Sequence, residues 1–405
     1  MFLTNMFVYD EGMTTPTIAI VGAGLSGLVC ARILQVHRIP VTVYELDPSA
    51  SARQQGGSLD IHTDSGQIAL KEAGLYEEFL ARTHVGGEAM RVLDKTAHVF
   101  IDQPEPEGGN GRPEIDRKVL RQLFVDSLRP DTIVWGSKVV AVRPAEPGHE
   151  IEFADGSTTR ADLVIGADGA WSKVRSVLTS VSPSYTGITL VEFRLSDATS
   201  KHPAALALTG QGSLFALSDN KYIGGHGGDE LALGCGLRVP EDWSTGHGVD
   251  WDDAVQARAA LLREYPDWDA SLTDLIRESD DTIWPRPIYA LPVGHTWEHV
   301  TGVTLVGDAA HLMSPFAGEG ANLAMIDGAD LARAIIADED LDTAVTAYEK
   351  KMFPRGAKSA KASANGLTMM FNDNSPKRLV SFFNRMIVLS RLVAPLAGVF
   401  GGKEK

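Results

Sequence analysis

The stretch Thr17-Ile-Ala-Ile-Val-Gly22-Ala-Gly24-Leu-Ser-Gly27 decides the fold, because an apolar run passes directly into a glycine-rich turn. The apolar run is typical of a buried parallel strand, and the residues after the turn predict a helix. In such a turn Gly22 permits the tight bend, Gly24 lets the backbone approach a pyrophosphate, and Gly27 lets helix and strand pack closely. The helix N-terminus adds free N–H groups and the positive end of its dipole, so the stretch predicts a dinucleotide site.

A carboxylate follows at the spacing that such a site requires. The segment Val41-Thr-Val-Tyr-Glu45 is predicted to form the next strand, and Glu45 lies 23 residues after Gly22. A carboxylate at the end of this strand suits a hydrogen bond to an adenosine ribose. A glycine-rich turn that binds nothing is the alternative, and the combined spacing of strand, helix and acid argues against it.

Two later landmarks narrow the choice of cofactor. The first is Leu163-Val-Ile-Gly-Ala-Asp168-Gly169, and the second is Val306-Gly-Asp308-Ala-Ala-His311, which continues to Pro315, Gly318, Gly320 and Asn322. Together with the glycine turn, in this order, they resemble the class A (single-component) FAD-dependent monooxygenases. Within that class the chain is most similar to the tetracycline-inactivating flavin monooxygenases, from Thr17 to about Gly356. The segments that carry this similarity are Arg112-Pro-Glu-Ile-Asp-Arg117, Tyr265-Pro-Asp-Trp-Asp269, Gly307 to Gly318 and Tyr348-Glu-Lys-Lys-Met-Phe353.

The resemblance implies a set of FAD-binding residues. Asp308 is expected to accept a hydrogen bond from the ribityl chain, although a role as a helix cap is compatible with it. The turn with Pro315, Gly318, Gly320 and Asn322 is expected beside the flavin ring, where a helix dipole stabilises negative charge.

Further contacts to the cofactors are expected from charged side chains. By the resemblance Arg117 grips phosphate or ribityl oxygens, and Arg121 lies one helical turn further on the same face. Asp60 matches a flavin-contacting position and Arg53 a position implicated in NADPH binding, with a solvated loop arginine as the alternative. The remaining expectations concern two landmark side chains. By the resemblance Asp168 supports the pyrophosphate region of FAD or the nicotinamide cofactor, and the alternative is that it only organises Ser172 and Arg175. His311 is expected to pack under the flavin loop rather than to act as a base.

The expected fold is α/β, with a Rossmann-type FAD-binding domain interleaved with a smaller antiparallel-sheet substrate domain and followed by a C-terminal helix. Short alternating segments between residues 186 and 239 predict the antiparallel sheet. The expected division is residues 1–15 as a flexible extension, 16–75, 98–180 and 286–355 as the FAD domain, 76–97 and 181–285 as the substrate domain, and 356–405 as a C-terminal helical segment.

Composition excludes several classes of partner. The chain has 37 basic and 53 acidic residues and no basic stripe, so we expect no nucleic-acid partner. Two cysteines and the absence of a His-x-x-His pair argue against a disulfide framework and against a metal site. The apolar stretch Met386–Gly402 is interrupted by Arg391 and Pro395, so it is not expected to span a membrane. We expect a cytoplasmic monomer.

The reaction is implied by the resemblance. NADPH reduces FAD, the reduced flavin reacts with O2 to give a C4a-hydroperoxide, and one oxygen atom passes to an electron-rich phenol or enol, in an aromatic or polyketide substrate. No catalytic side chain is assigned, because the cofactor carries the chemistry. A second dinucleotide fingerprint is absent, so NADPH is expected to dock transiently on the surface. The alternatives are a reductase or dehydrogenase that forms no hydroperoxide, a halogenase, whose Trp-x-Trp-x-Ile-Pro signature is absent, and a non-enzymatic FAD-binding module.

The substrate positions depart from the tetracycline-inactivating pattern. The positions of its Gln, Arg and His clamp read Glu192, Gly212 and Gly234 here. The two glycines predict a roomier pocket, and a buried Glu192 would need a donor, which favours an amine-bearing substrate. Phe215, His226 and Phe316 are further candidates for the pocket lining, with simple packing as the alternative.

Overall fold

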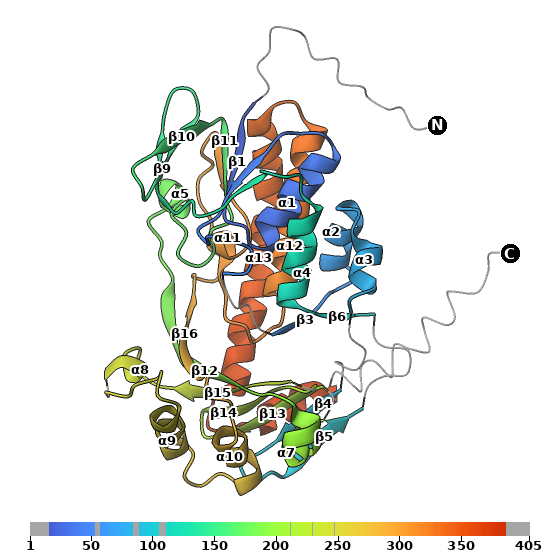
Figure 1. Cartoon of the computed structure of the whole chain (residues 1–405), viewed down its shortest axis with the longest axis vertical. Helices are drawn as coiled ribbons and strands as arrows, with labels where there is room; N and C mark the ends of the chain where they lie inside the picture. The colour runs from blue at the N-terminus through green and yellow to red at the C-terminus, as the bar shows by residue number, and fades with distance from the viewer. Residues whose placement is uncertain are drawn as a thin grey trace, which may run out of the picture.

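The computed structural model describes residues 16–52, 57–83, 89–104, 111–210, 212–228, 230–246 and 248–385. Figure 1 shows two regions, one containing β1 and α1 and the other containing β12 to β15, with helix α13 running from the first to the second. The expected N-terminal extension and the apolar stretch from Met386 lie outside the described residues, as does Arg53. In the described part of the chain no helix is both long and apolar enough to cross a membrane.

A five-stranded parallel sheet forms the centre of the first region, in the order β17-β11-β1-β2-β7. Every residue of β1 and β11 is buried, as expected for parallel strands covered on both faces. Helices α1 and α12 pack against each other over the sheet. The strands are β1 Ile18–Val21, β2 Thr42–Tyr44, β7 Ile133–Val134, β11 Leu163–Gly166 and β17 Val303–Leu305, and the helices are α1 Leu25–Val36 and α12 Gly320–Ala337.

Shorter elements complete this region. The sheets are β3 Ser58–Asp60 with β6 Glu114–Asp116, and β8 Val139–Pro144 with β9 His149–Phe153 and β10 Thr158–Ala161. The helices are α2 Gly66–Glu72, α3 Tyr76–Leu80, α4 Arg117–Ser127, α5 Arg175–Leu178 and α11 Asp308–His311. Phe79 of α3 is fully buried in the same core as β1, so the assignment of residues 76–80 to the substrate domain is wrong.

A seven-stranded sheet dominates the second region, in the order β16-β12-β15-β14-β13-β4-β5. It is not wholly antiparallel as expected, because β4 runs parallel to β13. The strands are β4 Met90–Leu93, β5 Val99–Gln103, β12 Ser184–Leu195, β13 Ser213–Ser218, β14 Lys221–His226, β15 Leu231–Arg238 and β16 Trp284–Ala290. Since β5 and β16 pair within this sheet, the boundaries expected at residues 98 and 286 cut through it.

Different elements pack against the two faces of this sheet. One face packs under helices through Val191, Phe193 and Leu233, which alternate with residues of the other face. The covering helices are α6 Ala198–Lys201, α7 Pro203–Thr209, α8 Trp243–Gly246, α9 Ala254–Glu264 and α10 Ala270–Arg277. The sheet therefore presents its opposite face toward the first region (Figure 1).

Helix α13 (Leu341–Met370) covers part of that opposite face. Its end packs with Phe371 and Leu379 on Val92 and Ile188 of the sheet. A Cβ on Gly236 would lie 2.7 Å from the Phe371 ring, so a glycine is needed for this approach. The helix is continuous through residue 355, so the C-terminal helical segment does not begin at the expected boundary.

Candidate active site

The glycine turn after β1 is packed as the sequence predicts. Gly22 has a φ of 104°, and a Cβ on it would overlap with the carbonyl oxygen of Ala167 at the end of β11. A Cβ on Gly27 would overlap with the carbonyl oxygen of Gly22, which confirms the close packing of helix and strand. Gly24 is the N-cap of α1, and a Cβ there would meet only Ala167 O, at 3.7 Å. Space is therefore left in front of the helix N-terminus, where a phosphate is favoured.

Glu45 supports this turn directly. It is buried, and its carboxylate accepts hydrogen bonds from the backbone N–H of Ala23 at 2.5 Å and of Asp47 at 2.9 Å. Glu45 therefore ties the second strand to the glycine turn, while its contact with a ribose stays a prediction.

Arg121 braces the same turn from α4. Its Nε donates to the carbonyl oxygen of Ala23 at 3.0 Å, and its Nη1 donates to that of Ala50 at 3.1 Å. The side chain is buried, so Arg121 does not belong to a solvated face of the helix. Its guanidinium is already engaged by the backbone and acts on the site by shaping the turn.

Arg117 lies at the start of α4, near side chains of both regions. The residue is exposed, yet the surrounding protein lowers the pKa of its guanidinium by desolvation. The charges of Asp308 and Glu192 oppose that decrease, and the charge of Arg286 adds to it. Access to solvent combined with desolvation is typical of a side chain at the bottom of a cleft. This cleft brings Asp308 of the first region close to two side chains of the seven-stranded sheet.

The loop beside this cleft leaves its predicted ligand groups accessible. Asp308 is exposed and accepts no hydrogen bond from any residue that the structure describes. Gly318 has a φ of 67°, and a Cβ on Gly318 or Gly320 would meet no atom within 4 Å. Pro315 is exposed at the start of the same turn. The loop therefore offers an open surface to a flat ring.

Behind this surface, the Asn322 side chain hydrogen-bonds to the backbone beside Asp60. The Asn322 amide accepts from the N–H of His62 at 2.8 Å and donates to the carbonyl oxygen of Asp60 at 2.8 Å. Burial raises the pKa of the Asp60 carboxyl, but the hydrogen bond and charge of His62 and the charge of Arg112 outweigh it, and the pKa is lowered. Asn322 is buried with both amide groups used, so the structure gives it a positioning role between β3 and α12.

Asp168 organises the turn after β11. Its carboxylate accepts from Ser172 Oγ at 2.5 Å and from the Lys173 N–H at 2.7 Å, and burial raises its pKa despite these bonds. Arg175 then donates to the carbonyl oxygen of Ala309 at 3.0 Å, which joins this turn to the third landmark. The expected structural role of Asp168, which is to organise Ser172 and the turn that carries Arg175, is thus present in the molecule.

A buried network lies under the loop of Asp308. His311 hydrogen-bonds through Nε2 to Asp327, a fully buried residue of α12 that sequence reasoning missed. Asp327 also accepts from the Gly307 N–H at 3.1 Å and from Arg355 of α13 at 2.8 Å. Desolvation lowers the pKa of His311, but Asp327 outweighs this and the pKa is raised. The expectation that His311 packs under the loop and is not a free base is in agreement with this contact.

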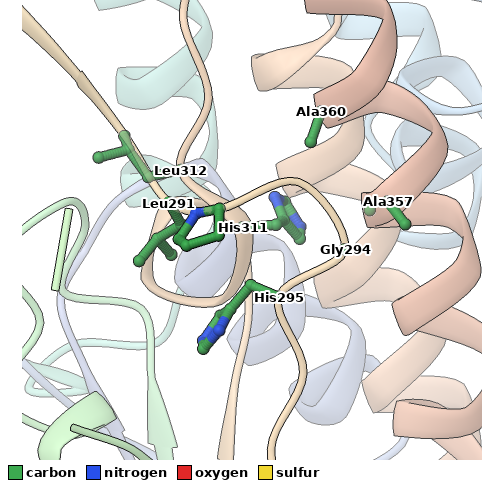
Figure 2. Close-up of a pocket in the computed structure, with 9 residues that line it drawn as sticks. Leu291, Gly294, His295, His311, Leu312, Ala357 and Ala360 are labelled. Atoms are coloured by element: carbon green, nitrogen blue, oxygen red, sulfur yellow. The ribbon is translucent and has the colours of Figure 1, made fainter. Parts of the chain in front are cut away.

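A small pocket lies beside His311. Figure 2 shows it between His311, the segment of Leu291 to His295, and the α13 residues Ala357 and Ala360. Its volume of about 10 Å³ has room for about one water molecule. The pocket is therefore far too small for a flavin or an organic substrate. The described residues also contain no group of three or more His, Cys, Asp or Glu side chains arranged to hold a metal ion.

The cleft-facing side of the seven-stranded sheet carries the candidate substrate residues. Glu192 is paired with Arg286 of β16 at 3.2 Å, a residue that sequence reasoning missed. Arg286 thus supplies the donor that Glu192 was expected to need, while the preference for an amine-bearing substrate stays a prediction. Gly234 lies directly opposite Glu192 on β15.

The other candidate substrate residues differ in what surrounds them. A Cβ on Gly212 would overlap with the backbone of Ala89, so Gly212 does not widen the pocket as expected. His226 pairs with Glu114 of β6 at 2.9 Å and links the sheet to the first region. Phe316 packs edge-on against Phe371 with ring centroids 5.3 Å apart, and Phe215 belongs to the same apolar cluster.

Comparison with known proteins assigns the cofactor of this site. The family model described as "FAD binding domain" matches residues 14–208 and 296–362, more than half of the chain. The chain belongs to this FAD-binding family. Monooxygenase penA of Penicillium thymicola is 30% identical, over 89% of this chain and 97% of the relative. Monooxygenase asqM of Emericella nidulans is 31% identical, over 88% of this chain and 96% of the relative. The chain is accordingly an FAD-dependent monooxygenase, an oxidoreductase.

Solved structures show the same fold. Klebsiella pneumoniae HpxO in complex with FAD and uric acid matches with a TM-score of 0.77 at 19% identity, over 94% of each chain. Tetracycline destructase Tet(55) matches with a TM-score of 0.71 at 18% identity, over 94% of this chain and 96% of that chain. The α/β fold is thus confirmed, but the comparison does not single out the tetracycline-inactivating enzymes.

Proposed function

We propose that this enzyme uses NADPH and O2 to hydroxylate an electron-rich aromatic or enolic small molecule held between the flavin cleft and the seven-stranded sheet. The observation that carries the proposal is the position of Arg117. Arg117 lies within electrostatic reach of Asp308 on the cofactor side and of Glu192 and Arg286 on the sheet. A flavin held by Asp308 would therefore lie close to a substrate held by Glu192 and Arg286.

The residues present fit FAD. The free N-terminus of α1 suits the pyrophosphate, and the exposed Asp308 carboxylate suits a ribityl hydroxyl. The open backbone at Gly318 and Gly320 suits a flat ring, and the N-terminus of α12 directly after it favours negative charge. Bound FAD would store two electrons and activate O2.

The overall reaction balances with two co-substrates. NADPH supplies two electrons as a hydride and the solvent supplies one proton. One oxygen atom of O2 enters a C–H bond of the substrate to give C–OH, and the other leaves as water with these two hydrogens. The chain contributes orientation and exclusion of water, because the apolar cluster of Phe215, Phe316 and Phe371 flanks the cleft-facing side of the sheet. Arg53 remains our proposed contact for NADPH.

Tetracyclines are one candidate substrate class, because a tetracycline destructase shares the fold. The Glu192–Arg286 pair replaces the clamp expected for that class, so we propose a broader search among flat phenols and enols. The direct test is NADPH-dependent incorporation of ¹⁸O from ¹⁸O2 into such compounds, with O2 uptake recorded in parallel. Labelled product supports the proposal, and NADPH oxidation by a different acceptor without any labelled product favours the alternative of a reductase or dehydrogenase.

A further inference from the structure

His299 joins two carboxylates near the start of the long helix α13. It belongs to the connection between β16 and β17, and both of its ring nitrogens contact α13. Nδ1 lies 2.9 Å from Glu349 Oε2, and Nε2 lies 2.9 Å from Asp342 Oδ1. Asp342 and Glu349 are about two helical turns apart along α13, so they lie on the same side of the helix and the imidazole bridges them.

The two contacts together require a proton that a neutral ring does not have. A neutral imidazole carries one N–H donor and one lone pair, whereas the imidazolium carries two N–H donors. If Nε2–H donates to Asp342, a neutral ring would place the Nδ1 lone pair against an oxygen of Glu349 at 2.9 Å. A proton must therefore lie between Nδ1 and Glu349, and it resides on His299 because imidazole is the stronger base.

Glu349 is the buried member of this cluster. Its side chain is 4% exposed, against 40% for Asp342. Glu349 Oε1 accepts from Trp297 Nε1 at 2.9 Å and from Thr304 Oγ1 at 2.8 Å. Among the residues that the structure describes, no lysine or arginine is recorded in contact with Glu349. His299 thus supplies the countercharge of a buried carboxylate, which would be costly to leave without a cation.

The cluster lies where three segments of the chain meet. Thr304 belongs to β17, Trp297 to the connection before β17, and Glu349 to α13. The next residues repeat the link, because Tyr348 OH donates to the carbonyl oxygen of Leu305 at 2.9 Å. The loop that is open toward FAD follows β17 directly, and α13 runs on to the seven-stranded sheet (Figure 1). The junction of β17 and α13 therefore supports both regions of the molecule.

The surroundings of His299 favour its protonated form. The charged groups in contact with the ring are the carboxylates of Asp342 and Glu349 on α13, whereas β17 contributes the neutral hydroxyl of Thr304 to the same cluster. Desolvation lowers the pKa of His299, but the hydrogen bonds and charges of Asp342 and Glu349 outweigh it, and the pKa is raised. The stability from this contact is therefore complete below about pH 6.5 and is lost as pH rises through the raised pKa.

We propose that His299 is a pH-sensitive clasp, whose proton fastens the start of α13 to β17 and whose deprotonation in alkaline solution opens this junction locally. Loss of the proton leaves Glu349 buried without a cation and turns a ring lone pair toward it. The hydrogen bonds from Trp297 and Thr304 remain, so the junction loosens while the rest of the chain stays folded. The inference concerns the fold around the FAD loop and does not depend on the substrate.

The test is hydrogen exchange of the backbone amides in the FAD-loaded full-length protein, at about pH 6 and about pH 9, with the intrinsic effect of pH on exchange corrected for. Exchange reports local opening of a structure that is otherwise folded. In the parent, protection of residues 303–305 and 345–350 should fall by about tenfold or more at the higher pH.

The decisive variant is Glu349→Gln. The amide oxygen of the new side chain can accept from Trp297 and Thr304, and its NH2 group can donate to Nδ1 of neutral His299. The junction then needs no extra proton, so protection should change by less than about threefold between the two pH values. His202→Gln is the matched control, because His202 contacts a single carboxylate, that of Glu278, at 2.8 Å. This control should keep the pH dependence of the parent.

Two exchange results overturn the inference: equal protection of the parent at both pH values, or a fall that persists undiminished in Glu349→Gln. Carbon-13 NMR of the histidine side chains gives a second measurement, which decides the matter if Glu349→Gln does not fold. The signal that is missing in His299→Gln should titrate in the parent with a midpoint above about pH 6.5. A midpoint at or below that value would show that His299 holds no extra proton, and the clasp would be rejected.

Discussion

The glycine turn at the end of β1 and the cleft-facing side of the seven-stranded sheet are built on different principles. In the turn, Gly22 and Gly27 leave no room for a Cβ, and the groups offered to a ligand are backbone N–H groups. On the sheet, the polar groups belong to the side chains of Glu192 and Arg286, which lie on different strands and remain partly exposed. The cofactor end is therefore a property of local backbone geometry, whereas the proposed substrate end depends on which side chains the sheet brings together.

Among the variants that test this comparison, Asp327→Asn should lose the most stability. Asp327 is fully buried and holds Gly307, His311 and Arg355, so we expect a loss of about 3–5 kcal/mol in the free energy of unfolding. Denaturant titration of the apoprotein across pH measures it.

The same variant has a predicted pH dependence. The pKa of His311 is raised above its ordinary value of 6.5, so the stability from His311–Asp327 is complete below about pH 6.5. It is lost as pH rises through the raised pKa, so the difference between parent and variant should be largest at low pH. Asp330→Asn is the control, because Asp330 pairs with Arg333, Lys351 and Arg355 but not with His311. A difference for Asp327→Asn that is independent of pH would contradict the assignment.

Gly22→Ala should cause the next largest loss in the free energy of unfolding. The positive φ costs about 1 kcal/mol, and the overlap with Ala167 costs about 2 kcal/mol more. Gly156→Ala is the matched control, because Gly156 also has a positive φ, of 84°, but a Cβ there would meet no atom within 4 Å. Thermal or denaturant unfolding of both variants separates the two costs. Equal losses would show that conformation alone, and not close packing against β11, requires Gly22.

Asp308→Ala should weaken FAD binding with little effect on the fold. A lost hydrogen bond to a charged group costs about 1.5–3 kcal/mol, which is roughly a ten- to hundredfold increase in Kd for FAD. The stability of the apoprotein should change by less than about 0.5 kcal/mol, because Asp308 is exposed and no bond to it is recorded among the described residues. Fluorescence titration with FAD tests the first value. Unchanged FAD affinity would remove Asp308 from the site.

Arg286→Gln should have the smallest effect on the protein itself. A partly exposed ion pair contributes about 0–1 kcal/mol, so stability should change by no more than that. The affinity for FAD should stay within about twofold, because Arg286 belongs to the sheet. A loss above about 2 kcal/mol would mean that the Glu192–Arg286 pair holds β12 and β16 together, and the contrast between the two regions would weaken.

The residues that sequence analysis identified and missed differ in a consistent way. Gly22, Gly24 and Gly27 are recognisable because their requirement arises within one turn. Arg286 and Asp327 carry no local signal, since an arginine in a strand and an aspartate in a helix are usually solvated. The only hint of Arg286 was the need of Glu192 for a donor, which sequence reasoning assigned to the substrate instead.

The domain boundaries were misplaced for a related reason. Strands β5 and β16 lie in the sequence beside segments of the first region, yet their hydrogen-bond partners are β4 and β12. Alternation of apolar residues predicts a strand but does not specify which sheet it joins.

The sequence alone determined the α/β fold, the FAD-binding turns and the membership of a monooxygenase family, because these depend on glycines and carboxylates at fixed spacing along the chain. Only the tertiary structure decided that Glu192 is neutralised by Arg286, that Asn322 and Arg121 are engaged by backbone, and that Asp327 supports the loop of Asp308. The physical reason is that charge pairing and desolvation depend on distance in space, which residues far apart in the sequence acquire only when each region folds.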